Sequence, residues 1–362
     1  MRKGLEEISA PCFCQAMEKT PQLTKRETTI LEAIVRNYIV HGTPAGSRFL
    51  SKNTDLGLSS ASIRNVMGDL EEQGFLTHPH TSAGRLPTDK GYRYYVDQIM
   101  QLINLPANVR TQIKRSLKQC DPTDMHLLLE AASHALSKAS RQLGVVLAPR
   151  LEQGLFRHVH IFQMASNRYL FNLTIDSGFV KTMVAEIQTE ISAERLERAC
   201  NVMNKLFDGK ALNELNRDSC QLYTGVEKYD MGVIRLFIPS LKKMAASPRK
   251  EEVYADGETN IMLKPEFADP AQMSSIVEIL EEKKLLVHML EVNDVSENKV
   301  IISIGGENSD GQLQSFSIVK TKYRIGNLNG ALGILGPKRM PYGYLVSAVD
   351  YTARVLDEMY RM

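Results

Sequence analysis

Residues 58–88 read LSSASIRNVMGDLEEQGFLTHPHTSAGRLPT, and their pattern decides how the N-terminal part of this chain is expected to fold. Four apolar residues recur with the spacing of one helix face: Ile63, Val66, Met67 and Leu70. Ser59 or Ser60 can cap this helix at its start, and Gly74 stands where a left-handed residue commonly ends one. The stretch therefore predicts an amphipathic helix with a defined inward face.

The second half of the stretch predicts two short strands joined by a polar loop. Pro79, Gly84 and Pro87 exclude a helix over residues 75–88, and small polar residues fill the middle. This is the pattern of a β-wing that follows a helix.

The segments on either side predict further helices. Thr24 and Glu27 have the spacing of a capping box and precede an apolar pattern of helical period. Residues 47–52 follow a break at Pro and Gly and allow only a short helix. Residues 89–105 return to helical spacing and end before Pro106, which is the first expected domain border.

Beyond that border the chain alternates between helical and period-two patterns, which predicts a mixed α+β fold. Helices are expected over residues 109–119, 125–142, 192–207, 231–244, 271–290 and 345–360, with Pro239 interrupting the fourth. Strands are expected over residues 159–161, 169–175, 183–187, 300–304 and 314–319, the first three in one antiparallel sheet. Asp256-Gly257, between two apolar pairs, predicts a hairpin.

Composition and charge exclude several classes of protein. The 362 residues favour two or three domains, and 43% hydrophobic with 24% charged residues is typical of a globular chain. The N-terminus lacks an apolar signal core and the five cysteines are scattered, so we expect a cytoplasmic protein. The net charge of +2 gives no global field, so any affinity for nucleic acid must come from a local surface.

Helix, turn, helix and wing in this order are typical of a DNA-binding winged helix-turn-helix. With the apolar stripe turned inward, Arg64 and Asn65 lie on the outward side of the helix. An Arg side chain can bind the edge of a guanine, and an Asn side chain can bind the edge of an adenine. The candidate DNA-binding residues are Arg48, Ser59, Ser60, Ala61, Ser62, Arg64 and Asn65, with Thr77, His78, His80, Thr81, Ser82 and Arg85 in the wing. Arg85 is expected to face solvent and to reach a phosphate. The alternative is a winged helix used for protein contacts, with Arg64 and Arg85 merely solvated.

Several long segments resemble the HrcA family of heat-inducible transcription repressors. They are LTKRETTILEAIVRNYIVHGTPAGSRFLSK, LSSASIRNVMGDLEEQGFLTHPHTSAGRLPTDKGYRYYVD, DGETNIM, IGGEN and GALGILGPKRMPY, and the likeness covers almost everything after Pro21. The resemblance implies that a homodimer binds an inverted-repeat operator in double-stranded DNA and represses chaperone operons of the dnaK and groE type. It also implies relief on heat shock, and the GroEL chaperonin as a partner.

The resemblance further implies a division into a winged helix, a GAF-like domain and an inserted, helix-rich dimerisation domain. We expect a flexible tail at residues 1–20, the winged helix-turn-helix at 21–105, the GAF-like domain at 106–190 and 265–362, and the insert at 191–264. An alternative function is a winged-helix regulator whose GAF-like domain senses a small-molecule effector.

Other candidate sites have weaker support. Four spaced glycines suggest a phosphate loop: Gly326, Gly330, Gly333 and Gly336. The Lys-Ser/Thr pair and the helix that such a loop needs are missing, so we expect tight turns between strands. His158 and His160 share one face of a strand without a third ligand, which favours a polar sheet face over a metal site. The sequence offers no catalytic constellation, and we expect no enzyme activity, no cofactor and no metal.

Overall fold

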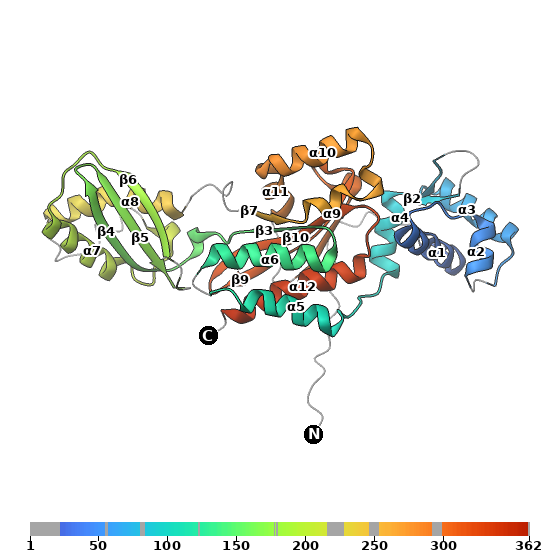
Figure 1. Cartoon of the computed structure of the whole chain (residues 1–362), viewed down its shortest axis with the longest axis horizontal. Helices are drawn as coiled ribbons and strands as arrows, with labels where there is room; N and C mark the ends of the chain where they lie inside the picture. Colours follow the sequence, from blue (N-terminus) through green and yellow to red (C-terminus); the bar gives the residue numbers. More distant parts are fainter. Residues whose placement is uncertain are drawn as a thin grey trace, which may run out of the picture.

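The structure is a computed structural model that describes residues 22–54, 57–79, 84–121, 124–176, 178, 180–215, 228–245, 253–291 and 299–360. It is a mixed α+β fold, as the sequence predicts. Figure 1 shows an elongated molecule in which a head, a body and a lobe follow one another along the long axis. None of the helices in the described ranges is long and apolar enough to cross a membrane. The expected tail at residues 1–20 lies outside these ranges.

The head, residues 24–99, contains the helices and short strands expected around the quoted stretch. In chain order they are α1 (Lys25–His41), α2 (Ser47–Asn53), α3 (Ser60–Glu72), β1 (Leu76–Thr77), β2 (Leu86–Pro87), α4 (Asp89–Tyr94) and the π-helical turn η1 (Tyr95–Ile99). The side chains and backbone amides of Thr24 and Glu27 bond reciprocally, which confirms the predicted capping box. Ile34 of α1 and Ile63 and Leu70 of α3 are fully buried in the head core.

The body is a five-stranded antiparallel sheet with helices on both sides. Its strand order is β7 (Val253–Asp256), β3 (Leu143–Leu147), β10 (Leu328–Pro337), β9 (Phe316–Ile325) and β8 (Ile301–Ile304). On one side lie α5 (Ala107–Lys118), α6 (Met125–Ser140) and α12 (Tyr342–Met359), and on the other α9 (Glu258–Met262), α10 (Pro270–Glu281) and α11 (Lys283–Leu290) (Figure 1). Short 3₁₀ turns occur at Leu151–Gln153, Leu212–Glu214, Pro265–Phe267, Gly305–Glu307 and Gly311–Leu313.

The lobe, residues 156–245, is a three-stranded antiparallel sheet with helices packed on one face. Its strands lie in the order β4 (Phe156–Ala165), β5 (Arg168–Ile175) and β6 (Val180–Glu186), and its helices are α7 (Ala193–Phe207) and α8 (Lys228–Ala245). The antiparallel sheet predicted from period-two segments is thereby confirmed. Helix α8 continues through Pro239, where the sequence predicts an interruption.

The sheets divide the chain differently from the expected borders. The sequence places residues 156–186 in the same domain as the body and residues 253–264 in the insert. In the structure residues 156–186 form the lobe sheet, whereas β7 pairs with β3 of the body, with Val253 opposite Leu147. A period-two pattern identifies a strand but does not identify the strand that pairs with it.

The prediction of a hairpin at Asp256-Gly257 is wrong, because a helix follows β7 directly. Gly257 has a φ of 96°, and α9 begins at the next residue. The side-chain amide of Asn260 donates to Ser137 Oγ at 3.1 Å and to the Gln142 carbonyl at 3.3 Å. These contacts with α6 and the residues after it favour the helical turn, and they are invisible in the local pattern.

The spaced glycines also differ from expectation. Gly326 lies in a turn with a φ of 58°, but Gly330, Gly333 and Gly336 lie inside strand β10. A Cβ atom at Gly330 would lie 2.3 Å from the Tyr323 ring, and one at Gly333 would lie 2.7 Å from the Val319 carbonyl oxygen. Close packing requires glycine at these strand positions.

Two predicted helices end early or break. The helix expected over residues 89–105 ends at Ile99, and Met100 has a ψ of 135°. The backbone amide of Ile103 donates to the carbonyl of Gly343 at 3.3 Å, so this connection lies on the start of α12. The helix expected over residues 271–290 breaks at Glu282, where ψ is 78°, into α10 and α11.

Candidate DNA-binding interface

The exposed face of α3 carries the residues that the sequence predicts for base contacts. Ser59 caps the helix, and its side chain accepts a hydrogen bond from the backbone amide of Ser62. Four of the expected residues are exposed: Ser59, Ala61, Arg64 and Asn65. Because Ile63 and Leu70 are fully buried, the opposite side of α3 must face outward. The structure thus places Arg64 and Asn65 together near the N-terminal end of α3.

Helix α2 is held against α3 and adds a second exposed guanidinium group. Ser47 Oγ lies 3.1 Å from Ser60 Oγ, so Ser60 is half-buried and serves the contact between the helices. Arg48 is exposed on α2, and within the described residues no carboxylate forms an ion pair with Arg48 or Arg64. Two guanidinium groups are therefore available to an outside ligand.

Arg85, the cation of the hairpin β1–β2, is partly buried rather than exposed as expected. Arg85 Nη2 forms an ion pair with Glu71 Oε2 at 2.7 Å, and the Arg85 side chain is only 26% exposed. Its backbone exchanges two hydrogen bonds with Ala45, at 2.9 and 3.1 Å. The expectation that Arg85 faces solvent is wrong, because α3 supplies a carboxylate within its reach. Thr77 is exposed, and His80, Thr81 and Ser82 lie outside the described residues.

Glu71 is the functional residue that sequence reasoning missed. It accepts from His78 Nδ1 as well as from Arg85, so one carboxylate of α3 binds both strands' ends. Burial works to raise the pKa of Glu71, but the hydrogen bond from His78 and the charge of Arg85 outweigh it and lower that pKa. Carboxylates on the exposed face of a helix are common, so the sequence gives no signal that Glu71 contacts the hairpin. The contact becomes visible only in the folded structure.

The histidine pair of the lobe lies on the exposed side of β4. His158 Nε2 and His160 Nε2 are 2.9 Å apart, and Asn204 Nδ2 is 3.3 Å from His158 Nε2. Burial, and then the neighbouring His160, lower the pKa of His158. In the part of the chain that the structure describes, no three His, Cys, Asp or Glu residues gather as metal ligands would.

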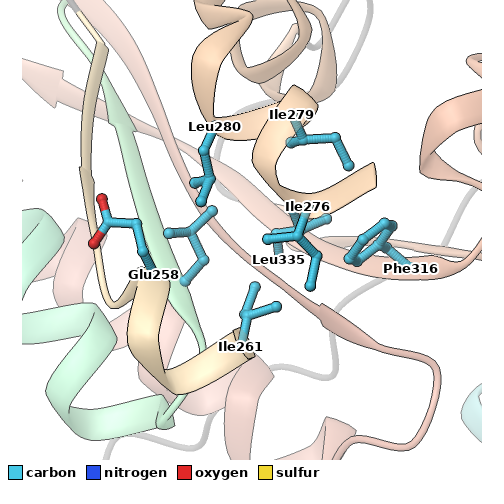
Figure 2. A pocket seen from close by; sticks show the side chains of 8 residues that line it. Glu258, Ile261, Ile276, Ile279, Leu280, Phe316 and Leu335 are labelled. Carbon is cyan, nitrogen blue, oxygen red and sulfur yellow. The ribbon is translucent and has the colours of Figure 1, made fainter. Parts of the chain in front are cut away.

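A narrow apolar hollow lies in the body between the sheet and helices α9 and α10. Its apolar lining comprises Leu143, Ile261, Ile276, Ile279, Leu280, Phe316 and Leu335. Figure 2 shows the carboxylate of Glu258 turned away from these side chains. The hollow has no room for a water-sized sphere, and it offers a ligand no convergent polar groups.

Comparisons with known proteins agree with one another. The family model for the HrcA protein C terminal domain matches residues 126–346. The heat-inducible transcription repressor HrcA of Chlorobium phaeobacteroides (strain BS1) is 38% identical over 91% of this chain and 96% of its own length. The repressor of the same name from Geobacter sulfurreducens is 36% identical over 93% of this chain and 98% of its own length. A crystal structure of a hypothetical protein shares the fold, with a TM-score of 0.56 and 22% identity over 93% of this chain and 97% of that one.

Proposed function

The chain belongs to the HrcA family of heat-inducible transcription repressors, and from this premise we propose that it binds an inverted-repeat operator as a homodimer. Its targets are chaperone operons of the dnaK and groE type, whose transcription it prevents until heat shock. The observation that carries the proposal is the open face of α3, where Arg64 and Asn65 are exposed side by side.

The head is proposed to act as a winged helix-turn-helix, with α3 in the major groove and β1–β2 as its wing. Arg64 is suited to a guanine edge and Asn65 to an adenine edge. Arg48, Ser59 and Ser62 lie around the start of α3, where phosphates of the same strand can be contacted. The loop residues His80, Thr81 and Ser82 are proposed to contact DNA phosphates or the floor of a groove, whereas Arg85 is proposed to brace the wing through Glu71.

The dimer is proposed to form through the uncovered face of the lobe sheet. Leu170 pairs with Phe162 on one side and with Val184 on the other, so these three residues form an apolar row across the sheet. Phe162 is 51% and Val184 41% exposed, and Val180, four residues before Val184 on the same strand, is 59% exposed. Exposed apolar groups in a contiguous row are typical of an interaction surface. A C₂ pairing of this row would give a symmetric dimer with two heads, one for each half-site of an inverted repeat.

The dimer contact is tested by placing charges in that row. Phe162→Asp with Val184→Asp should convert the dimer into a monomer in analytical ultracentrifugation, because two carboxylates cannot be buried without partners. Val40→Asp is the matched control, since Val40 is 70% exposed on α1 of the head. A double variant that stays dimeric contradicts the assignment.

The body is proposed to be the GAF-like domain, with the lobe inserted into it between β3 and β7. The hollow between the sheet and helices α9 and α10 has neither the room nor the polar groups that an effector needs, so it gives no support to the effector-sensing alternative. A GroEL-type chaperonin is proposed as the partner that maintains active repressor, as the family membership suggests.

Sequence-specific binding is the test of the proposed function. Fluorescence anisotropy should give a dissociation constant at least about 10³-fold lower for duplexes from the host's own chaperone promoters than for scrambled duplexes. Equal affinity for both duplexes across a range of salt concentrations contradicts repression through an operator.

A further inference from the structure

The head meets the body along α4 and the end of α1 (Figure 1). The body contributes two loops to this joint, residues 304–308 and residues 336–340, which read IGGEN and GPKRM. Both loops follow strands of the body sheet, β8 and β10, so they are held by a rigid part of the molecule. Polar contacts at three points join these loops to the head.

The first point is a guanidinium fork on α4. Arg93 Nε donates to Glu307 Oε1 at 2.7 Å, and Arg93 Nη2 donates to the carbonyl of Ile302 at 2.7 Å. The Glu307 carboxylate is fixed in turn, because it accepts from the backbone amide of Ile304 at 2.8 Å. Burial works to lower the pKa of Arg93, but the bonds to Glu307 and Asp97 raise it above its ordinary value. Arg93 therefore remains charged in this joint.

The second point is the first residue of α4. Asp89 Oδ1 accepts from Lys338 Nζ at 2.7 Å, and Asp89 Oδ2 accepts from the backbone amide of Gly306 at 2.9 Å. Gly305 has a φ of 55°, and a Cβ atom there would lie 2.1 Å from Asp89 Oδ2. The glycines of the first loop thus let the backbone approach this carboxylate.

The third point lies at the end of α1. Arg339 Nη1 donates to the carbonyl of Ile39 at 3.0 Å, while Arg339 Nε is bonded to Glu266 of the body. A cation is favoured there, because the last carbonyls of a helix carry partial negative charge. A Cβ atom at Gly42 would lie 3.1 Å from Arg339 Cζ, so the guanidinium lies close against the end of α1.

An apolar contact completes the joint but does not fix its orientation. Tyr92 of α4 and Tyr342 of α12 are both buried, with ring centroids 6.1 Å apart. Apolar contact is non-directional, whereas the hydrogen bonds at the three points are directional and lie on two different helices of the head. Three separated directional contacts determine how one rigid unit is rotated relative to another.

We propose that Asp89, Arg93, Glu307, Lys338 and Arg339 form a clamp that positions the head on the body at the one rotation suited to operator binding. The clamp uses α4 and the end of α1, so it leaves the exposed residues of α3 open to DNA. In a dimer it would hold two α3 helices at one separation, and operator spacing would be read through these five positioning residues. This inference rests on the proposed function.

The test compares a clamp variant with a matched control. The clamp variant carries Arg93→Gln and Lys338→Gln, and the control carries Arg354→Gln, which removes an ion pair with Asp350 inside α12. Binding is measured on a single half-site and on inverted repeats whose spacing changes in steps up to about 5 base pairs, half a helical turn.

The clamp variant should keep its half-site affinity but lose about tenfold in affinity for the correctly spaced repeat, since its second head is no longer held in place. Its preference among spacings should flatten, and the control should behave like the wild type. A clamp variant with wild-type affinity and spacing preference overturns the proposal.

A second measurement tests the clamp without DNA, so that a failure of the clamp can be told apart from a failure of the proposed function. Spin labels at Lys52→Cys on the head and Lys284→Cys on the body, in a background without other cysteines, should give a narrow distance distribution that the clamp variant broadens. Wild-type protein that binds no inverted repeat would refute the proposed function alone. Equally narrow distributions in the wild type and the clamp variant refute the clamp.

Discussion

At the residue scale, two charged side chains on α3 have different surroundings. Arg64 is exposed with no ion pair among the described residues, whereas Glu71, two turns later on α3, is occupied by His78 and Arg85. The first is available to an outside ligand, and the second holds the hairpin that follows α3. Substitutions at these positions should therefore have different consequences.

Loss of Arg64 or Asn65 should weaken discrimination between operator and random DNA. Each substitution to Ala should cost about 1–3 kcal/mol of preference, because a bidentate base contact is lost. Folding stability should change by no more than about 0.5 kcal/mol, since both side chains are exposed. Competition binding with circular dichroism measures both, and Arg36→Ala on the far helix α1 serves as the control. Variants that retain full preference would exclude these residues from base reading.

Glu71→Gln should make the head less stable at neutral pH, and the loss should shrink in acid. The folded-state pKa of Glu71 is below its ordinary value of 4.5, so its contribution is complete above that pH and is lost as the pH falls through the lowered value. The partner His78 is 42% exposed, and solvent screening limits the effect of such surface pairs to about 1 kcal/mol or less. Urea unfolding at pH 7 and pH 3 measures it, with the exposed neighbour Glu72→Gln as the control. A pH-independent difference would contradict this account.

At the element scale, two glycines in helices should respond oppositely to the same substitution. A Cβ atom at Gly68 in α3 meets nothing within 4 Å, so Gly68→Ala should stabilise the head by about 0.5–1 kcal/mol. A Cβ atom at Gly91 in α4 would lie 2.2 Å from the Phe75 carbonyl oxygen, so Gly91→Ala should destabilise it by about 1–3 kcal/mol. Thermal unfolding of both variants checks the pair, and equal signs would contradict the packing of α4 on the hairpin.

Elements whose patterns are local were predictable, and elements decided by distant contacts were not. Helices α1 and α3 follow from their caps and apolar stripes, and strand β5 of the lobe follows from strict alternation. The turn at Gly257 and the glycines of β10 depend on side chains more than a hundred residues away or on a neighbouring strand, which no window of sequence contains. Strand pairing is equally non-local, so the borders of the lobe could not be found from period alone.

In the candidate site, too, the features that depend on a local pattern were predictable and those that depend on distant contacts were not. The exposed residues of α3 could be predicted because the buried stripe of one helix defines its open face. The ion pair between Arg85 and Glu71 and the clamp residues of the body could not, because their partners come together only in the folded chain.

At the scale of the whole molecule, repression should be lost on mild heating and regained with a chaperonin. Native domains are stable by only about 5–15 kcal/mol, so a modest rise in temperature can reduce the folded fraction of a marginal regulator. Operator binding by the purified protein should fall within the host's heat-shock range and recover when a GroEL-type chaperonin with ATP is added. Binding that is unchanged by heat and by the chaperonin would contradict a heat-responsive repressor.

Footprinting of the purified protein on its own chaperone-operon promoters is the most direct test of the central claim. At the growth temperature we predict two symmetric protected half-sites, because a two-fold dimer with one α3 helix per head must read an inverted repeat. Protection should disappear together at both half-sites after heat shock, and Arg64→Ala should weaken both equally. Protection of a single half-site, or none that is distinguishable from random DNA, would contradict the claim that this chain is a dimeric operator-binding repressor.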